Sequence, residues 1–357
     1  MTGHHADGRK RGLFGTLLEF CVSLFRSRRA RTARKFREAV TNLPEFLNCG
    51  EIRLCVISSF CLLFPCCEDH YRKFFLWKDR EHTRKRWIEA PDDELKALQR
   101  RILRLFYLLA PSPYAHGFTI GRGIVSNAGI HTGKKYVIKL DLKDFFPSVT
   151  GTMIRRELRD SGIFTKENSR EMEILLKLCL LEDRLPQGAP TSPALANLVC
   201  RKLDFILAKF ARRHGMQYSR YADDLAFSCD SDGCFRLIPV IRKIIEQYGF
   251  QVNSRKINVL KRHQRQTVTG LVVNHAGMTS VPRRKRMKLR ACLHRIATGK
   301  MDLSEAGYAK LKGHVSLIRM ANPRQGLYFR KQLEIIEKMR SGACIPGKAQ
   351  YNEAGRF

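Results

Sequence analysis

The sequence contains no Cys-x-x-Cys pair, although it has 12 cysteines among its 357 residues. Structural zinc sites usually draw thiolate ligands from pairs at this spacing. Cys66 and Cys67 are adjacent, and Cys229 and Cys234 lie five positions apart, so neither pair fits. A zinc site is therefore not expected. The cysteines are interpreted as reduced, mostly buried thiols of a cytoplasmic protein.

Long apolar runs are also absent. The stretch at residues 12–26 is interrupted by Glu19 and lacks the small-residue cleavage site of a secretory signal. The run at residues 54–67 is shorter than the ~20 apolar residues that span a bilayer. Both are interpreted as core or docking helices, and no stable membrane insertion is expected. An interfacial amphipathic anchor at residues 12–26 stays open as an alternative.

Acidic residues are scarce. Asp and Glu total 33 against 66 Lys and Arg, which gives a formal net charge of +33. Because the basic excess runs through most of the chain, it indicates a polyanion partner, whose bound counterions are released on binding. Composition does not distinguish DNA from RNA. With 44% hydrophobic residues, the chain is long enough to bury the cores of two or three subdomains.

Against this basic background, two adjacent carboxylates occur in the tetrad Tyr221-Ala222-Asp223-Asp224. Apolar and aromatic residues alternate on both sides of it, which predicts two strands joined by a tight turn. Two carboxylates at one turn repel each other unless a cation neutralises them, and Mg²⁺ prefers such oxygen ligands. An ordinary exposed hairpin turn is the alternative.

A third carboxylate, Asp141, ends a strand-like apolar run that includes Val137, Ile138 and Leu140. If this strand lies beside the tetrad, the three carboxylates can hold two metal ions ~3.5–4 Å apart, as in polymerases. The alternative is that Asp141 and Asp144 cap the following helix.

A third motif decides between these alternatives. Gln187-Gly188 precede Ser192-Pro193, which open an apolar helix, with Ser192 suited to the N-cap and Pro193 to the first turn. Gly188 allows the backbone to approach a ligand closely. The chain resembles the reverse transcriptases, because it contains three of their motifs in the same order. These are a strand ending in Asp, a Pro-Gln-Gly loop with Ser-Pro, and Tyr-Ala-Asp-Asp.

The resemblance implies an α+β fold of the right-hand polymerase kind, with fingers, a ferredoxin-like palm and a helical thumb. Residues 71–91 predict the fingers hairpin, and residues 283–340 are basic and helical in pattern. The expected divisions are a basic helical N-terminal extension at 1–60, fingers at 61–130, a palm with part of the fingers inserted at 131–275, and the thumb at 276–357.

The resemblance also assigns the chemistry. Asp141, Asp223 and Asp224 are expected to bind two Mg²⁺ ions, which position the primer hydroxyl and neutralise the triphosphate. Lys256 matches the lysine that protonates the leaving pyrophosphate, with a solvent-facing lysine as the alternative. Asp144 is expected to cap a helix or form a salt bridge.

Five further residues are implied to bind the incoming deoxynucleotide. Lys78 and Arg86, in the hairpin, match basic residues that hold the triphosphate, and an exposed charge run is the alternative. Phe146 matches the aromatic residue that lies under the sugar and leaves no room for a ribose 2′-hydroxyl. Gln187 and Gly188 would border the nucleotide.

Two signatures narrow the resemblance. Asn127-Ala128 with His131 is similar to the Asn-Ala-x-x-His signature of bacterial retron reverse transcriptases. The tripeptide that begins at Val268 is similar to their Val-Thr-Gly signature. The alternatives are a strand-entry turn and a β-turn glycine. The residues expected to help seat RNA are Asn127, His131, Val268, Thr269 and Gly270.

The retron resemblance covers roughly residues 70–335. It implies a cognate structured non-coding RNA, priming from the 2′-hydroxyl of an internal guanosine, and a branched RNA–DNA product (msDNA) that stays bound. It also implies a bacterial anti-phage defence unit with a separate effector protein. Other bacterial reverse transcriptases, of group II introns, diversity-generating elements or other defence systems, are the nearest alternative. A non-catalytic RNA-binding scaffold is another, and its signature would be loss of an acidic ligand.

Overall fold

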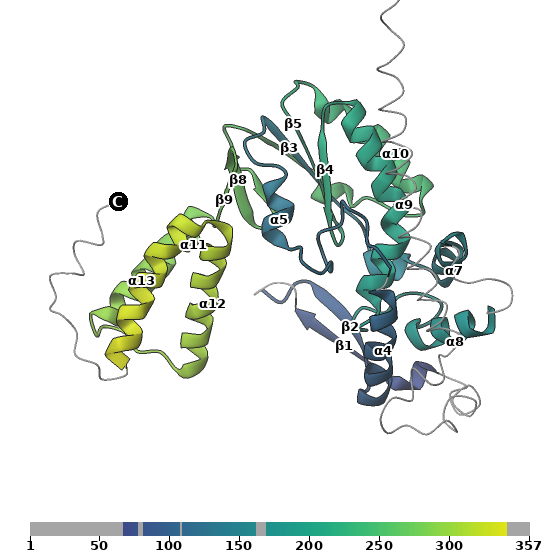
Figure 1. Ribbon diagram of the computed structural model, residues 1–357, viewed down its shortest axis with the longest axis horizontal. Helices are drawn as coiled ribbons and strands as arrows, with labels where there is room; N and C mark the ends of the chain where they lie inside the picture. The colour runs from purple at the N-terminus through teal and green to yellow at the C-terminus, as the bar shows by residue number, and fades with distance from the viewer. Residues whose placement is uncertain (1–66, 78–80, 108, 162–168, 341–357) are drawn as a thin grey trace, which may run out of the picture. The chain divides into compact units, whose positions relative to one another are not determined.

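The computed structural model describes residues 67–77, 81–107, 109–161 and 169–340 (Figure 1). The expected extension at residues 1–60 lies outside these ranges, as does Lys78. Contacts divide the chain into two interleaved units. The first joins the residues before Pro113 to Asp144–Arg201, and the second joins Pro113–Lys143 to the residues from Lys202 onward.

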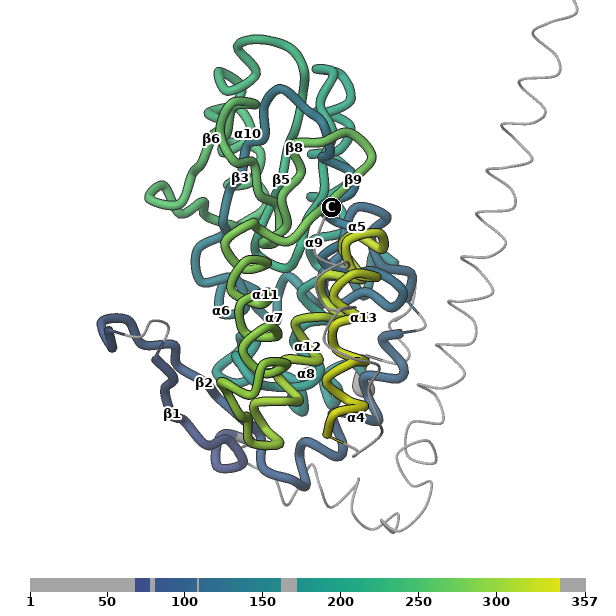
Figure 2. Tube along the Cα trace, turned by 90° about the vertical axis from the view of Figure 1, so that its left-hand side faces the viewer, coloured from purple at the N-terminus to yellow at the C-terminus, as the bar shows by residue number. Residues whose placement is uncertain are grey.

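The first unit carries an antiparallel hairpin of β1 (Tyr71–Trp77) and β2 (Lys85–Pro91), as the sequence predicted. Figure 2 traces the two strands. Only the base of the hairpin is buried, at Tyr71, Glu89 and Pro91, whereas every residue of β1 beyond Tyr71 is exposed. A two-stranded hairpin is marginally stable alone, so its base must be held by neighbouring elements.

Helices of the first unit provide that support. Asp92 caps the first of them by accepting a hydrogen bond from the Leu95 backbone N–H at 2.9 Å. Buried Gln99 donates to the Tyr71 hydroxyl and to the Leu178 carbonyl, both at 2.8 Å, which ties the hairpin to two helices. The helices are α4 (Asp93–Phe106), α6 (Phe145–Ser148), α7 (Gly151–Asp160) and α8 (Ser169–Cys179).

The second unit is built on a four-stranded antiparallel sheet in the order β4-β5-β3-β6. Helices connect β3 to β4, and α10 (Ile238–Gln247) connects β5 to β6, which is the ferredoxin-like arrangement that the sequence predicted. The strands are β3 (Tyr136–Asp141), β4 (Gln217–Tyr221), β5 (Asp224–Cys229) and β6 (Asn258–Lys261).

Both faces of this sheet are covered. On one face, Tyr218 and Arg220 of β4 bind Asp204 of α9 (Ser192–Arg213). On the other face, Val137 and Ala226 belong to a core shared with α5 (Ile124–Gly129). Because both faces are buried, nearly every residue of β3 is apolar or inaccessible.

A second, three-stranded antiparallel sheet follows, which the sequence analysis did not predict. It consists of β7 (Thr267–Val268), β8 (Leu271–His275) and β9 (Met278–Ser280). The helices predicted for residues 283–340 are present as α11 (Arg283–Ala297), α12 (Glu305–Ala321) and α13 (Pro323–Arg340). Val273 of the sheet and Leu311 and Ile336 of the helices share one buried core. Within the described ranges, no helix is both long and apolar enough to cross a membrane.

Candidate active site

Three carboxylates lie at one end of the four-stranded sheet. Asp141, the last residue of β3, pairs directly with Asp224, the first residue of β5. Asp223 lies in the turn between β4 and β5, and its carbonyl accepts a hydrogen bond from Leu142 N–H at 2.9 Å. Strand pairing therefore brings together carboxylates that are 82 and 83 positions apart in the sequence. Ala222 has a φ of 56°, a left-handed conformation that is uncommon for a residue with a Cβ.

The electrostatics of this cluster favour a cation. Burial, and then the negative charge of Asp223, raise the pKa of Asp224 to about 6. The Lys256 ammonium lies 2.8 Å from both carboxylate oxygens of Asp141. In the described part of the chain, no three acidic, histidine or cysteine groups converge tightly enough to enclose a metal ion by themselves. The cluster therefore presents hard oxygen donors whose charge one lysine partly neutralises.

Behind the turn lies a buried ion pair that the sequence analysis missed. Arg220 and Asp204 are fully buried, with guanidinium nitrogens 2.8 Å from each carboxylate oxygen. The Tyr218 hydroxyl donates to the same carboxylate at 2.8 Å. Arg220 also donates to the Ala222 carbonyl at 3.2 Å, so the pair reaches the backbone of the turn itself. The sequence carries no clear signal for this pair, because Asp204 lies on a helix that also carries exposed charged residues such as Lys202 and Lys209.

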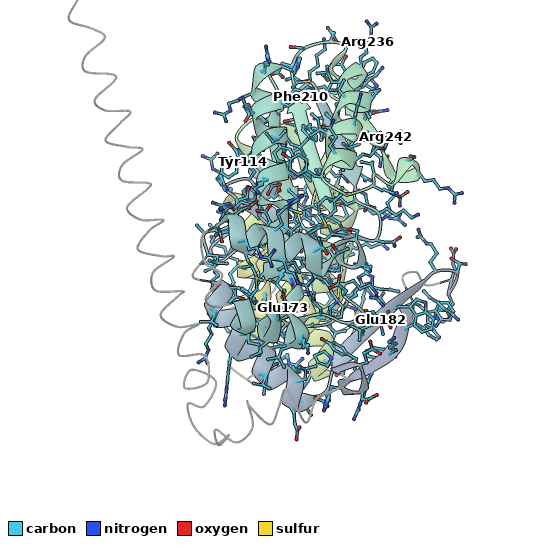
Figure 3. All side chains as sticks on the ribbon, turned by 90° about the vertical axis from the view of Figure 1, so that its right-hand side faces the viewer. Tyr114, Glu173, Glu182, Phe210, Arg236 and Arg242 are labelled. Carbon is cyan, nitrogen blue, oxygen red and sulfur yellow. The ribbon has the colours of Figure 1, made fainter. Side chains whose placement is uncertain are left out.

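A backbone segment of the second unit also supports the turn. Arg220 N–H donates to the Tyr114 carbonyl, and His116 N–H donates to the Arg220 carbonyl, both at 2.8 Å. Tyr114, labelled in Figure 3, packs its ring against Phe205 of α9. A Cβ at Gly117 would lie 2.6 Å from the Ala222 backbone nitrogen, so only glycine permits this approach.

The expected nucleotide-binding residues lie in the first unit. Arg86 is exposed on β2, and Phe146 is half-buried beside the buried Phe145, with ring centroids 5.3 Å apart. Gln187 accepts a hydrogen bond at its carbonyl from Glu89 N–H at 2.9 Å.

Gly188 also lies close to the hairpin backbone. A Cβ at Gly188 would lie 2.7 Å from the Glu89 carbonyl oxygen and 3.2 Å from the Ile88 side chain. The close approach that the structure shows is to strand β2 of the hairpin. Ser192 departs from expectation, because its hydroxyl donates to the Pro186 carbonyl at 2.8 Å and it begins α9 rather than preceding it.

Comparison with known proteins identifies the family of the chain. A family model for reverse transcriptase (RNA-dependent DNA polymerase) matches residues 78–273. The chain is 38% identical over 289 residues to the retron Mx162 reverse transcriptase of Myxococcus xanthus, which aligns 72% of this chain and 60% of that protein. It is 36% identical over 241 residues to the retron Ec86 reverse transcriptase of Escherichia coli, which aligns 67% of this chain and 74% of that protein. The chain belongs to the retron-type reverse transcriptases.

This membership confirms the α+β right-hand polymerase fold that the sequence predicted. The retron-type chain spans 60% of the length of the Mx162 enzyme and 59% of the retron Mx65 reverse transcriptase of the same organism, to which it is 42% identical over 256 residues and 67% of its own length.

Two solved structures are also similar to the chain. One is telomerase from Candida albicans in complex with a fragment of telomeric RNA, with a TM-score of 0.44 and 13% identity over 75% of this chain and 56% of that one. The other is a foamy viral protease–reverse transcriptase in complex with double-stranded DNA, with a TM-score of 0.45 and 14% identity over 80% of this chain and 42% of that one.

The retron signature residues have structural roles in the second unit. His131 is fully buried, and its ring nitrogens lie 2.7 Å and 2.8 Å from the hydroxyls of Ser228 and Ser219. Burial lowers the pKa of His131 to about 3, so the ring is neutral. Asn127 and Val268 are also buried. These three side chains cannot contact RNA in this structure.

The last two signature residues form a turn. Thr269 and Gly270 have φ values of 46° and 80° and connect β7 to β8, which is typical of a two-residue hairpin turn. The Thr269 hydroxyl donates to the Ile124 carbonyl at 2.9 Å, which joins the turn to α5. Gly270 is exposed. Of the five residues expected to contact RNA, only these two retain accessible surface beyond a few per cent.

Proposed function

We propose that this chain is an RNA-directed DNA polymerase that copies a cognate structured non-coding RNA into DNA. The observation that carries the proposal is the direct pairing of Asp141 with Asp224, with Asp223 in the adjoining turn and buried Arg220 behind it. A scaffold that only binds RNA has no need for three carboxylates gathered at one end of a sheet, beside a braced turn, in a protein of net charge +33.

Mg²⁺ fits this cluster. Its oxygen donors are the type that Mg²⁺ prefers, and substrate phosphates usually supply the rest of its coordination. Burial, and then the negative charge of Asp223, raise the pKa of Asp224, and a bound cation would favour its ionised form. Asp141, Asp223 and Asp224 would hold two ions, which activate the primer hydroxyl and neutralise the triphosphate when bound.

In the reaction, the primer hydroxyl oxygen bonds to the α-phosphorus of the deoxynucleoside triphosphate. The bond from that phosphorus to the bridging oxygen breaks, the hydroxyl proton passes to solvent water, and the leaving pyrophosphate takes up a proton. We assign the second proton to Lys256, whose ammonium is held at the edge of the cluster by Asp141. Arg86, Gln187 and Gly188 would border the triphosphate, as would Lys78 outside the described residues.

Retron membership supports the finer proposal. The enzyme would start from a 2′-hydroxyl of an internal guanosine, produce msDNA that stays bound, and act in the bacterial cytoplasm in anti-phage defence with a separate effector protein. Thr269 and Gly270 are the signature residues still accessible to RNA, while His131 would act by holding strands β4 and β5 together.

Substitution of Asp223 tests the catalytic assignment. In protein co-expressed with its cognate RNA, Asp223→Asn should lower DNA synthesis by about 10³-fold, since a metal ligand contributes several kcal/mol to the transition state. RNA affinity should change by less than about twofold, because one charge is a small part of the electrostatic attraction. Asp302→Asn, an exposed aspartate of the same unit, is the control.

Near-wild-type synthesis by Asp223→Asn with Mg²⁺ would overturn the metal assignment. Debranching enzyme should release RNA from the wild-type product. A product without a 2′-5′ branch would remove the proposed priming mode and leave the polymerase assignment intact.

Phe146→Ala tests sugar selection. Removing the ring should raise the efficiency of ribonucleotide relative to deoxynucleotide incorporation by about tenfold or more, since a steric block of a few kcal/mol is lost. The ratio is measured by single-nucleotide extension of an annealed primer, with Phe145→Leu as the buried neighbour control. An unchanged ratio in folded Phe146→Ala would assign the ring to packing alone.

A further inference from the structure

The β1–β2 hairpin of the first unit carries a cluster of exposed aromatic side chains. Phe75 pairs directly with Trp87, and Trp77 pairs with Lys85. Directly opposed residues project from the same side of an antiparallel pair, as do residues two apart on one strand. Phe75, Trp77, Lys85 and Trp87 therefore share one side of the hairpin, here called the aromatic face.

The aromatic face is ordered within itself. The Phe75 ring lies 5.2 Å from Trp77 and 5.5 Å from Trp87, both edge to face. The Lys85 ammonium lies 4.3 Å from the centre of the Phe75 ring and 5.4 Å from that of Trp77, within cation–π range. The rings hold one another in place and position a positive charge among them.

This order is achieved without burial. Phe75 is 38% exposed, Trp77 42% and Trp87 60%. Grouped exposed aromatic residues are unfavourable in water and mark interaction sites on soluble proteins. Packing within the fold accounts for the base of the hairpin but not for these rings.

The base of the hairpin keeps the aromatic face apart from the expected nucleotide site. Lys73 and Glu89 share its side and are bound by Glu182 and Arg184, at 2.8 Å and 2.7 Å respectively. Glu182 is labelled in Figure 3. On the opposite side of the hairpin, Arg86 pairs with Leu76.

Ile88, two residues after Arg86 on β2, shares that opposite side and approaches Gly188. The triphosphate residues thus occupy one side of the hairpin and the aromatic cluster the other. The aromatic face is therefore available to a ligand other than the incoming nucleotide.

The charge of the hairpin identifies that ligand. Residues 71–91 contain seven Lys and Arg against three Asp and Glu. A positively charged surface with exposed aromatic rings is the combination that binds single-stranded nucleic acid, because unpaired bases stack on the rings while cations meet the phosphates. Paired bases cannot stack on the rings without leaving the duplex.

We propose that the aromatic face is a stacking platform for unpaired RNA nucleotides. Bases would stack on Trp77 and Trp87, and Lys85 would meet the phosphate backbone. The proposal deepens the proposed function, from which it takes RNA as the polyanion.

The chain offers a direct probe of this face, because Trp77 and Trp87 are its only two tryptophans. Intrinsic tryptophan fluorescence of the full chain therefore reports on the aromatic face alone. Titration with an unpaired RNA 12-mer should quench the fluorescence in a saturable way, and the same length of RNA duplex should quench it much less. Equal quenching by both, or none by either, would overturn the proposal.

Substitutions separate stacking from charge. Trp87→Leu keeps an apolar side chain but removes the ring, and it should weaken binding of the unpaired RNA about tenfold with an unchanged salt dependence. Lys85→Gln should instead reduce the slope of log affinity against log salt by about one. Phe74→Leu, which removes a 44%-exposed ring on the other side of the hairpin, is the matched control and should change affinity less than twofold. An effect of Phe74→Leu equal to that of Trp87→Leu would contradict the assignment to one face.

Two further measurements keep this proposal separate from the proposed function. Asp223→Asn, inactive in synthesis, should retain full quenching by unpaired RNA. In the wild type, synthesis without quenching would overturn the aromatic-face proposal and leave the polymerase assignment intact. Quenching without synthesis by the wild type would overturn the polymerase assignment and leave the aromatic-face proposal intact. Sedimentation of wild type and Trp87→Leu completes the test. A wild-type dimer that Trp87→Leu converts to monomer would assign the face to a second copy of the chain and overturn the RNA proposal.

Discussion

The molecule contains two β-hairpins of similar length that differ in almost every other respect. In the β1–β2 hairpin all residues of β1 beyond Tyr71 are exposed, and the turn region is rich in charge. In the β4–β5 hairpin most side chains are buried, Asp223 lies in the turn and Asp224 begins β5. The first hairpin is stabilised at its base alone, whereas the second is covered by elements on both sides.

This difference separates two uses of the same motif. A buried hairpin can hold reacting groups in fixed positions, because its neighbours determine each side-chain conformation. An exposed hairpin presents side chains to a ligand and tolerates change. The comparison predicts that equivalent substitutions in the two hairpins have very different consequences.

The largest expected contrast is between two arginines. Arg220→Met should destabilise the second unit by about 3–5 kcal/mol, because it leaves the Asp204 carboxylate buried without its partner. Arg86→Met, on the exposed hairpin, should change stability by less than about 0.5 kcal/mol. Urea unfolding with hydrogen exchange of the β4 and β5 amides measures both.

A control distinguishes the charge from the packing at Arg220. Arg220→Met combined with Asp204→Leu removes both charges and should recover much of the lost stability. If this double variant stays folded with slow DNA synthesis, and a higher Mg²⁺ concentration partly restores the rate, the pair positions the catalytic turn. Equal stability of Arg220→Met and wild type would contradict the role of the buried pair.

A second contrast concerns pH. His131 has a pKa of about 3 in the folded chain because of burial, against about 6.5 when unfolded. The unfolded state therefore binds the proton more readily, and stability present above pH 6.5 is lost as the pH falls toward 3. Between pH 7 and pH 5 His131 by itself should lower the stability of the second unit by about 2 kcal/mol, seen as faster exchange of the β4 and β5 amides.

His131→Gln should flatten this pH dependence while retaining hydrogen-bonding capacity toward Ser219 and Ser228. His116, whose pKa is lowered to about 4 mainly by burial, should supply the remaining dependence. The amides of the β1–β2 hairpin should not follow this titration. A wild-type second unit that keeps its full protection at pH 5 would exclude a buried neutral imidazole.

The smallest expected effect is at Asp224. Its pKa is raised to about 6, so above that pH the ionised carboxylate costs stability in the folded state. Asp224→Asn should stabilise the metal-free chain by roughly 1 kcal/mol at pH 7.5, after allowance for solvent screening. The gain should shrink as the pH falls below about 6, because the wild-type carboxyl then becomes neutral too. Thermal unfolding without divalent ions measures it, and a destabilised Asp224→Asn would mean that Lys256 already balances the cluster.

Much of the site was predictable because its residues belong to short sequence patterns. Alternation around Tyr221 and the apolar run before Asp141 predict strands, and like carboxylates at strand ends predict a cation site. The support behind the turn was not predictable. Arg220, Asp204 and Gly117 take their meaning from partners that periodicity does not identify. The second sheet was missed because its strands are short, with only two and three residues in β7 and β9.

The retron signatures show the same division. Their residues mark the family correctly, since identity to retron reverse transcriptases confirms it. His131, Asn127 and Val268 are buried, so any part they have in seating RNA would be indirect, because a motif records which residue is present and not which way its side chain points. The hydroxyls of Ser219 and Ser228 hold the His131 ring between strands β4 and β5.

The sequence by itself determined the family, the helices and main strands, and the three carboxylates, because these depend on residue type and short-range spacing. Only the tertiary structure decided which side chains are buried, which face of each hairpin is presented, and what braces the turn at Ala222. Burial and partnership are properties of segments far apart in the chain, so they arise when α9, β4 and the loop at Gly117 meet. A polar group in the interior needs a hydrogen-bonding partner, and a cluster of aromatic side chains at the surface marks a binding site. The first rule applies to the β4–β5 hairpin and the second to the β1–β2 hairpin.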